Sequence, residues 1–271
     1  MKKERRKKLL RTALLTLLLC LAFLSTASAQ AKGKLRALCV SGGPSFRYDA
    51  YYMQRALKEN ATNSYKVKAS NYFITGSGTT NSRVSSIMDQ VFSDSTSGDL
   101  NLFYFTGHGY AGVEVGDTNF SLSDVKGLVI NPYRGYVYSY YDLALKLTSY
   151  KADAIAIIDS CYAQAFYLNG VRRLSASRRK KLTLLLSSSW KQESYAASGS
   201  YDTNISYYSY ALLDGLGYWD DYIYLKCDTD DDGYATVREI FSYASRLIQG
   251  SRLKMTPYLY MLAGKNYRLY A

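Results

Sequence analysis

The sequence is poor in cysteine, proline and histidine, with four, three and one of them among 271 residues. So little proline, beside 48% hydrophobic residues, excludes a collagen-like or largely disordered chain. The few scattered cysteines exclude the disulfide framework of a small secreted domain. Beyond residue 29 no apolar run is long enough to cross a bilayer. The chain is therefore expected to fold around a hydrophobic core rather than around crosslinks.

Positive charge is concentrated at the start of the chain. The first eleven residues hold seven basic side chains and one acidic, which is half of the formal net charge of +12. An apolar run over 14–24 and a triplet of small residues at 27–29 complete the pattern of a secretory signal peptide over residues 1–29, with cleavage expected after Ala29. Retention of this segment as an anchor is the alternative. We expect a protein that is secreted or held outside the cell envelope, with no stable membrane insertion after cleavage.

Residues 30–271 have the length of one α/β domain and keep 27 basic against 21 acidic side chains. Because this excess is spread out apart from one basic segment, nucleic-acid binding is not expected. Periodicity predicts strands that alternate with helices, and hence a mostly parallel sheet flanked by helices on both faces. The predicted strands are 35–40, 65–73, 100–105, 154–158, 182–186 and 258–261. The predicted helices are 51–61, 81–92, 139–150, 207–216 and 237–248, and a small hairpin is expected within 110–128.

Two predicted strands end in residues with catalytic chemistry. His108, the only histidine, follows the strand 100–105, and Cys161 follows the strand 154–158. The carboxyl ends of neighbouring parallel strands share one edge, so both side chains are expected to face one crevice. An imidazole there activates a thiol, and the N–H groups of Gly109 and Cys161 could hold the oxyanion of an acyl transfer. The alternative is an inert buried thiol and an unrelated histidine.

The pattern Phe-Thr-Gly-His-Gly at 105–109 with Asp-Ser-Cys at 159–161 resembles the caspase-like cysteine peptidases, which include metacaspases, clostripain and legumain-type enzymes. The resemblance implies a three-layer αβα fold and an endopeptidase that cuts proteins or peptides and needs no cofactor for catalysis. It makes His108 the base, Cys161 the nucleophile and Gly109 an oxyanion donor. Tyr162 departs from the small residue usual after the nucleophile, which leaves the subfamily open.

The same resemblance implies that Asp159 lines the pocket for the substrate side chain before the scissile bond. A carboxylate there pairs with a guanidinium or ammonium, which predicts cleavage after Arg or Lys. Ser188, Ser189 and Glu193 match the region that supplies further pocket residues. The alternative is that Asp159 caps the turn after its own strand.

Six basic residues lie in the segment 172–181, between the cysteine strand and the next strand. Caspase-like enzymes are often nicked in this region, so an enzyme that prefers Arg or Lys could cut itself there. The alternative is a solvated loop.

An acidic loop over 228–239 matches the calcium-binding loop of an EF-hand. The pattern places ligands at loop positions 1, 3, 5, 7, 9 and 12 and a glycine, Gly233, at position 6. The predicted ligands are Asp228, Asp230, Asp232, the Tyr234 carbonyl, Thr236 and Glu239, and they predict a structural Ca²⁺. The alternative is an acidic turn in which Thr236 and Glu239 cap the next helix.

Taken together, these patterns predict an exported cysteine endopeptidase. A catalytically inactive protein of the same fold, or a calcium-dependent binding module, is the alternative. Three cysteines remain after signal cleavage. A bridge between Cys39 and Cys227 would leave Cys161 free, but the sequence does not decide that pairing.

Overall fold

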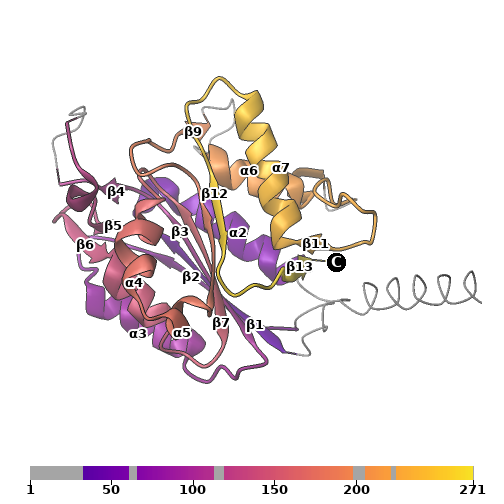
Figure 1. Ribbon diagram of the computed structural model, residues 1–271, viewed down its shortest axis with the longest axis horizontal. Helices are drawn as coiled ribbons and strands as arrows, with labels where there is room; N and C mark the ends of the chain where they lie inside the picture. The colour runs from indigo at the N-terminus through magenta and orange to yellow at the C-terminus, as the bar shows by residue number, and fades with distance from the viewer. Residues whose placement is uncertain (1–32, 61–65, 113–118, 198–204, 221–223, 271) are drawn as a thin grey trace, which may run out of the picture. The chain divides into compact units, whose positions relative to one another are not determined.

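The computed structural model describes residues 33–60, 66–112, 119–197, 205–220 and 224–270 (Figure 1). The predicted signal peptide, residues 1–29, lies outside them. Residues Lys32–Ala271 form one compact unit. Among the described residues no helix is both long and apolar enough to span a membrane.

A six-stranded sheet forms the centre of the fold, with the strand order β12-β8-β7-β3-β1-β2. Five strands run parallel, and β12 pairs antiparallel with β8 at one edge. The predicted α/β class with a mostly parallel sheet is confirmed. The strands are β1 (Lys34–Ser41), β2 (Lys66–Ile74), β3 (Leu100–Thr106), β7 (Asp153–Asp159), β8 (Leu182–Leu186) and β12 (Tyr258–Met261).

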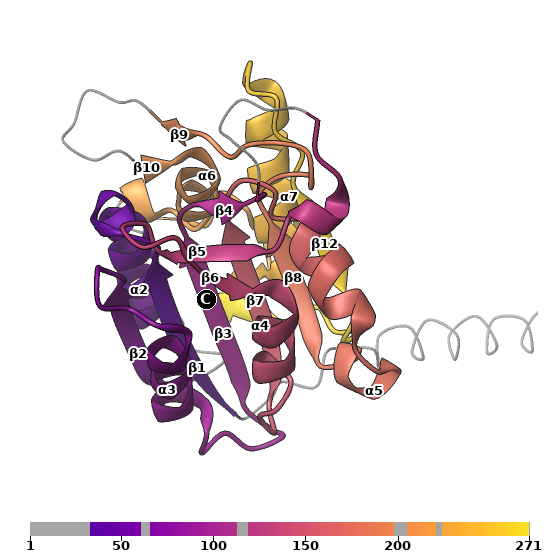
Figure 2. The same cartoon turned by 90° about the vertical axis from the view of Figure 1, so that its left-hand side faces the viewer.

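Helices cover both faces of the sheet, as the continuously apolar strands require. On one face lie α3 (Asn81–Phe92) and α4 (Tyr140–Leu147), which stand in front of the sheet in Figure 2. Helices α2 (Arg47–Asn60) and α6 (Tyr207–Gly215) cover the other face, and α7 (Val237–Gly250) packs on α6. Helix α3 buries Val84, Ile87, Met88, Val91 and Phe92, the apolar stripe that predicted it.

Helix α2 begins at Arg47, four residues before its predicted start. A 3-10 turn, η1 (Pro44–Phe46), leads into it with its proline at the start, where the missing N–H costs nothing. The earlier start places Asp49 in the first turn of the helix.

The basic segment is largely exposed to solvent, but it is helical rather than a loop. It contains η4 (Val171–Arg173) and α5 (Ala176–Arg179), which follow a π-helical turn, η3 (Phe166–Gly170). Its cations bind carbonyls at the C-terminus of α4, where Arg178 donates to Leu145 O and Lys181 to Thr148 O. The segment ends at the start of β8, so the length of that strand separates it from the carboxyl edge of the sheet.

Small antiparallel sheets complete the fold. The predicted hairpin is a three-stranded sheet of β4 (Gly109–Tyr110), β5 (Gly127–Asn131) and β6 (Tyr136–Ser139). The pairs β9 (Ala196–Ala197) with β10 (Ile205–Ser206) and β11 (Ala235–Thr236) with β13 (Arg268–Tyr270) were not predicted, because two or three residues carry no periodicity. The remaining 3-10 turns are η2 (Leu122–Asp124) and η5 (Tyr218–Asp220).

The three described cysteines are free thiols. Cys39 and Cys227 are both buried and form no bridge with each other, so the disulfide that the sequence left open is absent between them. Cys161 is partly exposed.

Candidate active site

The strand ends that carry His108 and Cys161 are in direct backbone contact. Thr106 at the end of β3 is the register partner of Asp159 at the end of β7. The pairing continues one step further, because the Gly107 N–H donates to the Asp159 carbonyl at 3.0 Å. A Cβ on Gly109 would overlap the carbonyl oxygen of Cys161, so only glycine permits this approach.

His108 and Cys161 line one cavity of about 700 Å³ at this edge of the sheet. The His108 ring packs edge-on against Phe46, with 5.0 Å between ring centroids. Among the described residues the thiol forms its hydrogen bonds with Ser194, and none joins it to the imidazole. Desolvation lowers the pKa of His108, and burial raises the pKa of the Cys161 thiol. Both groups are therefore neutral near pH 7, which leaves the imidazole free to accept the thiol proton.

Buried serines hold the turn that carries the nucleophile. The hydroxyls of Ser187 and Ser188 each donate to the Ser160 carbonyl at 3.0 Å, and the Ala163 N–H donates to Ser188 Oγ. This corrects the predicted substrate contact of Ser188, which is fully buried behind the turn. Ser189 does not line the cavity either, and its hydroxyl accepts from the Lys191 N–H.

Tyr162, the residue after the nucleophile, has a φ of 61°, in the region that favours glycine. Its ring lines the cavity and packs edge-on against Phe120. Glu193, also predicted in the pocket, lines the cavity from the loop after β8. Its negative charge contributes to the raised pKa of Cys161.

Asp159 is buried and lines the cavity. Its carboxylate accepts from Ser194 Oγ at 2.8 Å and from the N–H and hydroxyl of Ser209 at 3.1 and 2.5 Å. Ser209 lies in the first turn of α6, so Asp159 caps that distant helix. The alternative that it caps the turn after its own strand is wrong. Burial raises the pKa of this carboxyl.

A second buried carboxyl, Asp49, was missed by the sequence analysis. It accepts from the Thr106 hydroxyl at 2.8 Å and from the Ser206 N–H at 3.0 Å. Burial, followed by the charge of Asp159, raises its pKa to about 8. No basic side chain among the described residues forms an ion pair with either acid. No local signal marks Asp49, because its burial depends on contacts with β3 and α6.

Ser194 was missed as well. Its N–H donates to Cys161 Sγ at 3.4 Å, and its hydroxyl binds Asp159. It directly follows the predicted Glu193. The loop that contains these two residues lines the cavity, whereas the predicted Ser188 and Ser189 do not.

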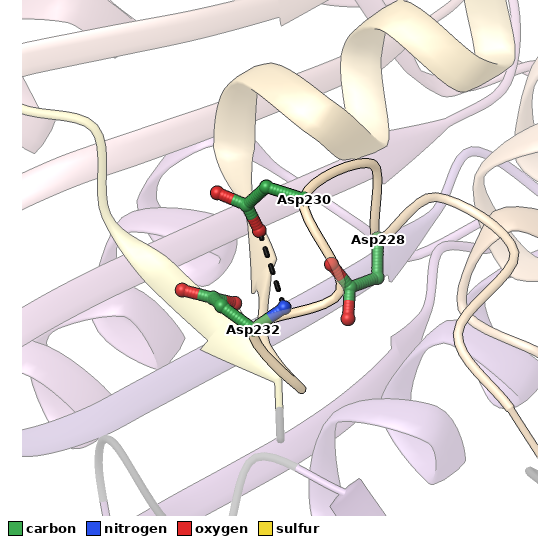
Figure 3. A group of neighbouring side chains, drawn as sticks. All are labelled: Asp228, Asp230 and Asp232. Atoms are coloured by element: carbon green, nitrogen blue, oxygen red, sulfur yellow. Dashed lines mark hydrogen bonds between the residues drawn. The ribbon is translucent and has the colours of Figure 1, made fainter.

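The acidic loop brings together three of its six predicted ligands, Asp228, Asp230 and Asp232 (Figure 3). Their carboxylate oxygens lie within 4.8 Å of one another. Asp228 Oδ1 is buried and has no hydrogen-bond partner among the described residues. Arg268 donates to Asp232 Oδ2 at 2.7 Å, which neutralises part of the cluster.

The carboxylate of Glu239 is engaged elsewhere. One oxygen accepts from the N–H and hydroxyl of Thr229, and the other from those of Thr236. Thr236 is the N-cap of α7, so the capping box that the sequence analysis held as the alternative is present. The described residues directly before the loop, 224–227, form a bend and a turn and contain no helix, whereas α7 follows the loop as the exiting helix of an EF-hand does.

The fold has three layers, with helices on both faces of the sheet, and adjoining strand ends carry Gly-His-Gly and Asp-Ser-Cys. These features define the class of caspase-like folds. Residues 45–267 match the caspase domain, and the chain belongs to that family. Members of this family are cysteine peptidases that act on proteins and need no cofactor for catalysis.

Solved structures agree with this fold. Caspase-1 from Spodoptera frugiperda is similar with a TM-score of 0.55 at 12% identity, over 87% of this chain and 88% of that one. Protein GSU0716 from Geobacter sulfurreducens is similar with a TM-score of 0.53 at 15% identity, over 84% of this chain and 92% of that one. No curated protein matches the sequence.

Proposed function

We propose that the protein is a cysteine endopeptidase with His108 and Cys161 as its catalytic dyad. The observation that carries the proposal is the contact between the two strand ends, which puts both side chains on one cavity. The thiol proton passes to the imidazole as Sγ attacks the scissile carbonyl carbon. The N–H groups of Gly109 and Cys161 stabilise the oxyanion. The imidazole then protonates the leaving amine, and water, deprotonated by His108, hydrolyses the acyl-enzyme.

We propose cleavage after Arg or Lys, with Asp159 as the acid that receives the cation. Asp49 does not line the cavity, but it accepts from two residues that do, Thr106 and Ser206. Two buried carboxyls without a basic partner among the described residues favour a cationic ligand over a neutral one. Glu193 at the wall of the cavity adds to the negative potential.

A panel of fluorogenic peptides that differ only before the scissile bond tests both proposals. We expect cleavage after Arg and Lys, little after Gln or Asp, and none by Cys161→Ala, which retains the fold. Hydrolysis that survives Cys161→Ala contradicts the assigned nucleophile. A preference for Gln contradicts the acidic pocket and leaves the dyad intact.

We further propose that the acidic loop binds Ca²⁺ through Asp228, Asp230 and Asp232, with Tyr234 O and Thr236 nearby. Glu239 would join only by exchanging its bonds to Thr229 and Thr236. Millimolar CaCl₂ should raise the melting temperature of the wild type but not of Asp230→Asn. An equal response of both proteins, or none, contradicts a site at these residues.

We also propose that residues 1–29 direct export and are then removed. N-terminal sequencing of protein recovered outside the producing cell should begin at Gln30. Recovery of the intact N-terminus in the membrane fraction would instead support the retained anchor.

A further inference from the structure

One residue joins the thiol to the acidic end of the cavity. Ser194 donates its backbone N–H to Cys161 Sγ at 3.4 Å and its hydroxyl to Asp159 Oδ1 at 2.8 Å. Asp159 itself stands only two residues before Cys161, and both line the same cavity. The nucleophile and the pocket acid are therefore parts of one hydrogen-bonded unit.

The charges around this unit are predominantly negative. Asp159 and Glu193 both oppose ionisation of the thiol, which burial already disfavours. Within the described part of the chain, the Ser194 N–H is the one contact from another residue that favours the thiolate. The described titratable groups that face the thiol, its neighbouring acid or the cavity are His108, Asp159, Glu193, Asp49, Tyr104, Tyr110, Tyr140, Tyr162, Tyr195 and Tyr208.

We propose that a cation bound against Asp159 in this cavity activates the Cys161 thiol, so that the enzyme reaches full nucleophilicity only when a basic substrate side chain is in place. This inference rests on the proposed peptidase function and adds a coupling between its pocket and its nucleophile. The bound cation cancels the field of the carboxylates at the sulfur. The thiol then loses its proton more readily, to the neutral imidazole of His108 or to water.

The size of the effect follows from the charge alone. A unit charge on the order of 8 Å from the sulfur, at an effective dielectric constant of about 20, shifts the thiol equilibrium about thirtyfold. Screening by solvent at the mouth of the cavity reduces this value. We expect about a tenfold rise in thiolate near neutral pH.

Alkylation by iodoacetamide measures this quantity directly, because the thiolate sulfur displaces iodide and the thiol does not. The rate at Cys161 is followed by mass spectrometry against pH, with saturating butylguanidine as the pocket cation. Butylurea, its neutral isostere, is the matched control. We expect butylguanidine to accelerate alkylation about tenfold near pH 7 and to move the midpoint of the profile to lower pH, with no change from butylurea. An unchanged or slower rate overturns the proposal.

Asp159→Asn provides the second arm. Removal of the charge should accelerate alkylation in the free protein and abolish the response to butylguanidine. If butylguanidine accelerates alkylation of this variant as much as that of the wild type, the proposal is overturned. If the variant does not fold, the comparison of butylguanidine with butylurea in the wild type tests the proposal alone. Cleavage of an arginine peptide by the same preparation separates the two hypotheses. Cleavage without acceleration refutes only the coupling, whereas acceleration without cleavage refutes only the peptidase function.

Discussion

The raised pKa of Asp49 predicts that cation binding to the pocket depends on pH. Asp49 keeps its proton up to about pH 8, because burial and the charge of Asp159 oppose its ionisation. A guanidinium bound at Asp159 leaves that proton in place below about pH 7, and ionisation of Asp49 at higher pH adds a second negative charge to the site. The affinity should therefore stay level below about pH 7 and rise about tenfold between about pH 7 and about pH 9.

The inhibition constant of butylguanidine against a fluorogenic arginine peptide measures this affinity without relying on the ionisation of the thiol. In the wild type it should decrease as pH rises from about 7 to about 9. In Asp49→Asn it should stay near its value at about pH 7 and lose most of this slope. Glu59→Gln removes one charge at the exposed end of the same helix and should behave like the wild type. A flat wild-type curve, or an undiminished slope in Asp49→Asn, would refute the assignment.

The same pKa has a consequence for stability. The folded protein binds the Asp49 proton more tightly than the unfolded chain, whose carboxyl has a pKa near 3.8. The stabilisation is fully present below that value and is lost as pH rises through about 8. Asp49→Asn should therefore melt higher than the wild type above about pH 8, by several degrees, and show no such gain near about pH 4. Differential scanning calorimetry at both pH values checks the sign.

Three further predictions concern the scaffold. Gly109→Ala should abolish peptide cleavage, because its Cβ overlaps the Cys161 carbonyl, whereas Gly78→Ala has no atom within 4 Å of its Cβ and should keep wild-type activity. Arg36→Ala should lower the free energy of unfolding in urea by about 3–5 kcal/mol, since it leaves two carboxylates without their buried partner, while Arg55→Ala on the surface should cost below about 1 kcal/mol. Intact masses of the wild type and Cys161→Ala should show no cut within 172–181, because that segment is helical and lies a strand's length from the nucleophile. A product ending at one of its basic residues, absent from Cys161→Ala, would contradict the last prediction.

Local patterns predicted the sheet because its central strands β3, β7 and β8 carry nearly continuous apolar runs. The bounds of α3, β8 and β12 agree with the prediction residue for residue, since periodicity and flanking polar residues mark both ends of each. The basic segment 172–181 was predicted wrongly for the opposite reason. Its short helices are held by α4, and no pattern within ten residues reports such a partner.

In the candidate site, too, the residues marked by a local pattern could be predicted, and those that depend on distant contacts could not. His108 and Cys161 could be placed together from sequence because each follows an apolar strand directly. Asp49 and Ser194 could not, because their roles depend on β3, β7 and α6 meeting in space. Ser188 looked accessible in sequence and is buried, since its hydroxyl is needed to satisfy the backbone of the turn at Ser160.

The position of the two acids at the start of α6 explains why a substrate cation is the missing component of this site. Asp49 accepts from the N-cap N–H of that helix, and Asp159 accepts from Ser209 in its first turn. A helix N-terminus carries about half a positive charge, which stabilises one carboxylate in part and cannot balance two. The free protein must therefore keep a proton on the pair, as the raised pKa of Asp49 indicates. The negative charge that remains on the pair is then balanced by the positive charge that the substrate brings. The fold thus ties recognition of Arg or Lys to the charge state of the groups beside the nucleophile.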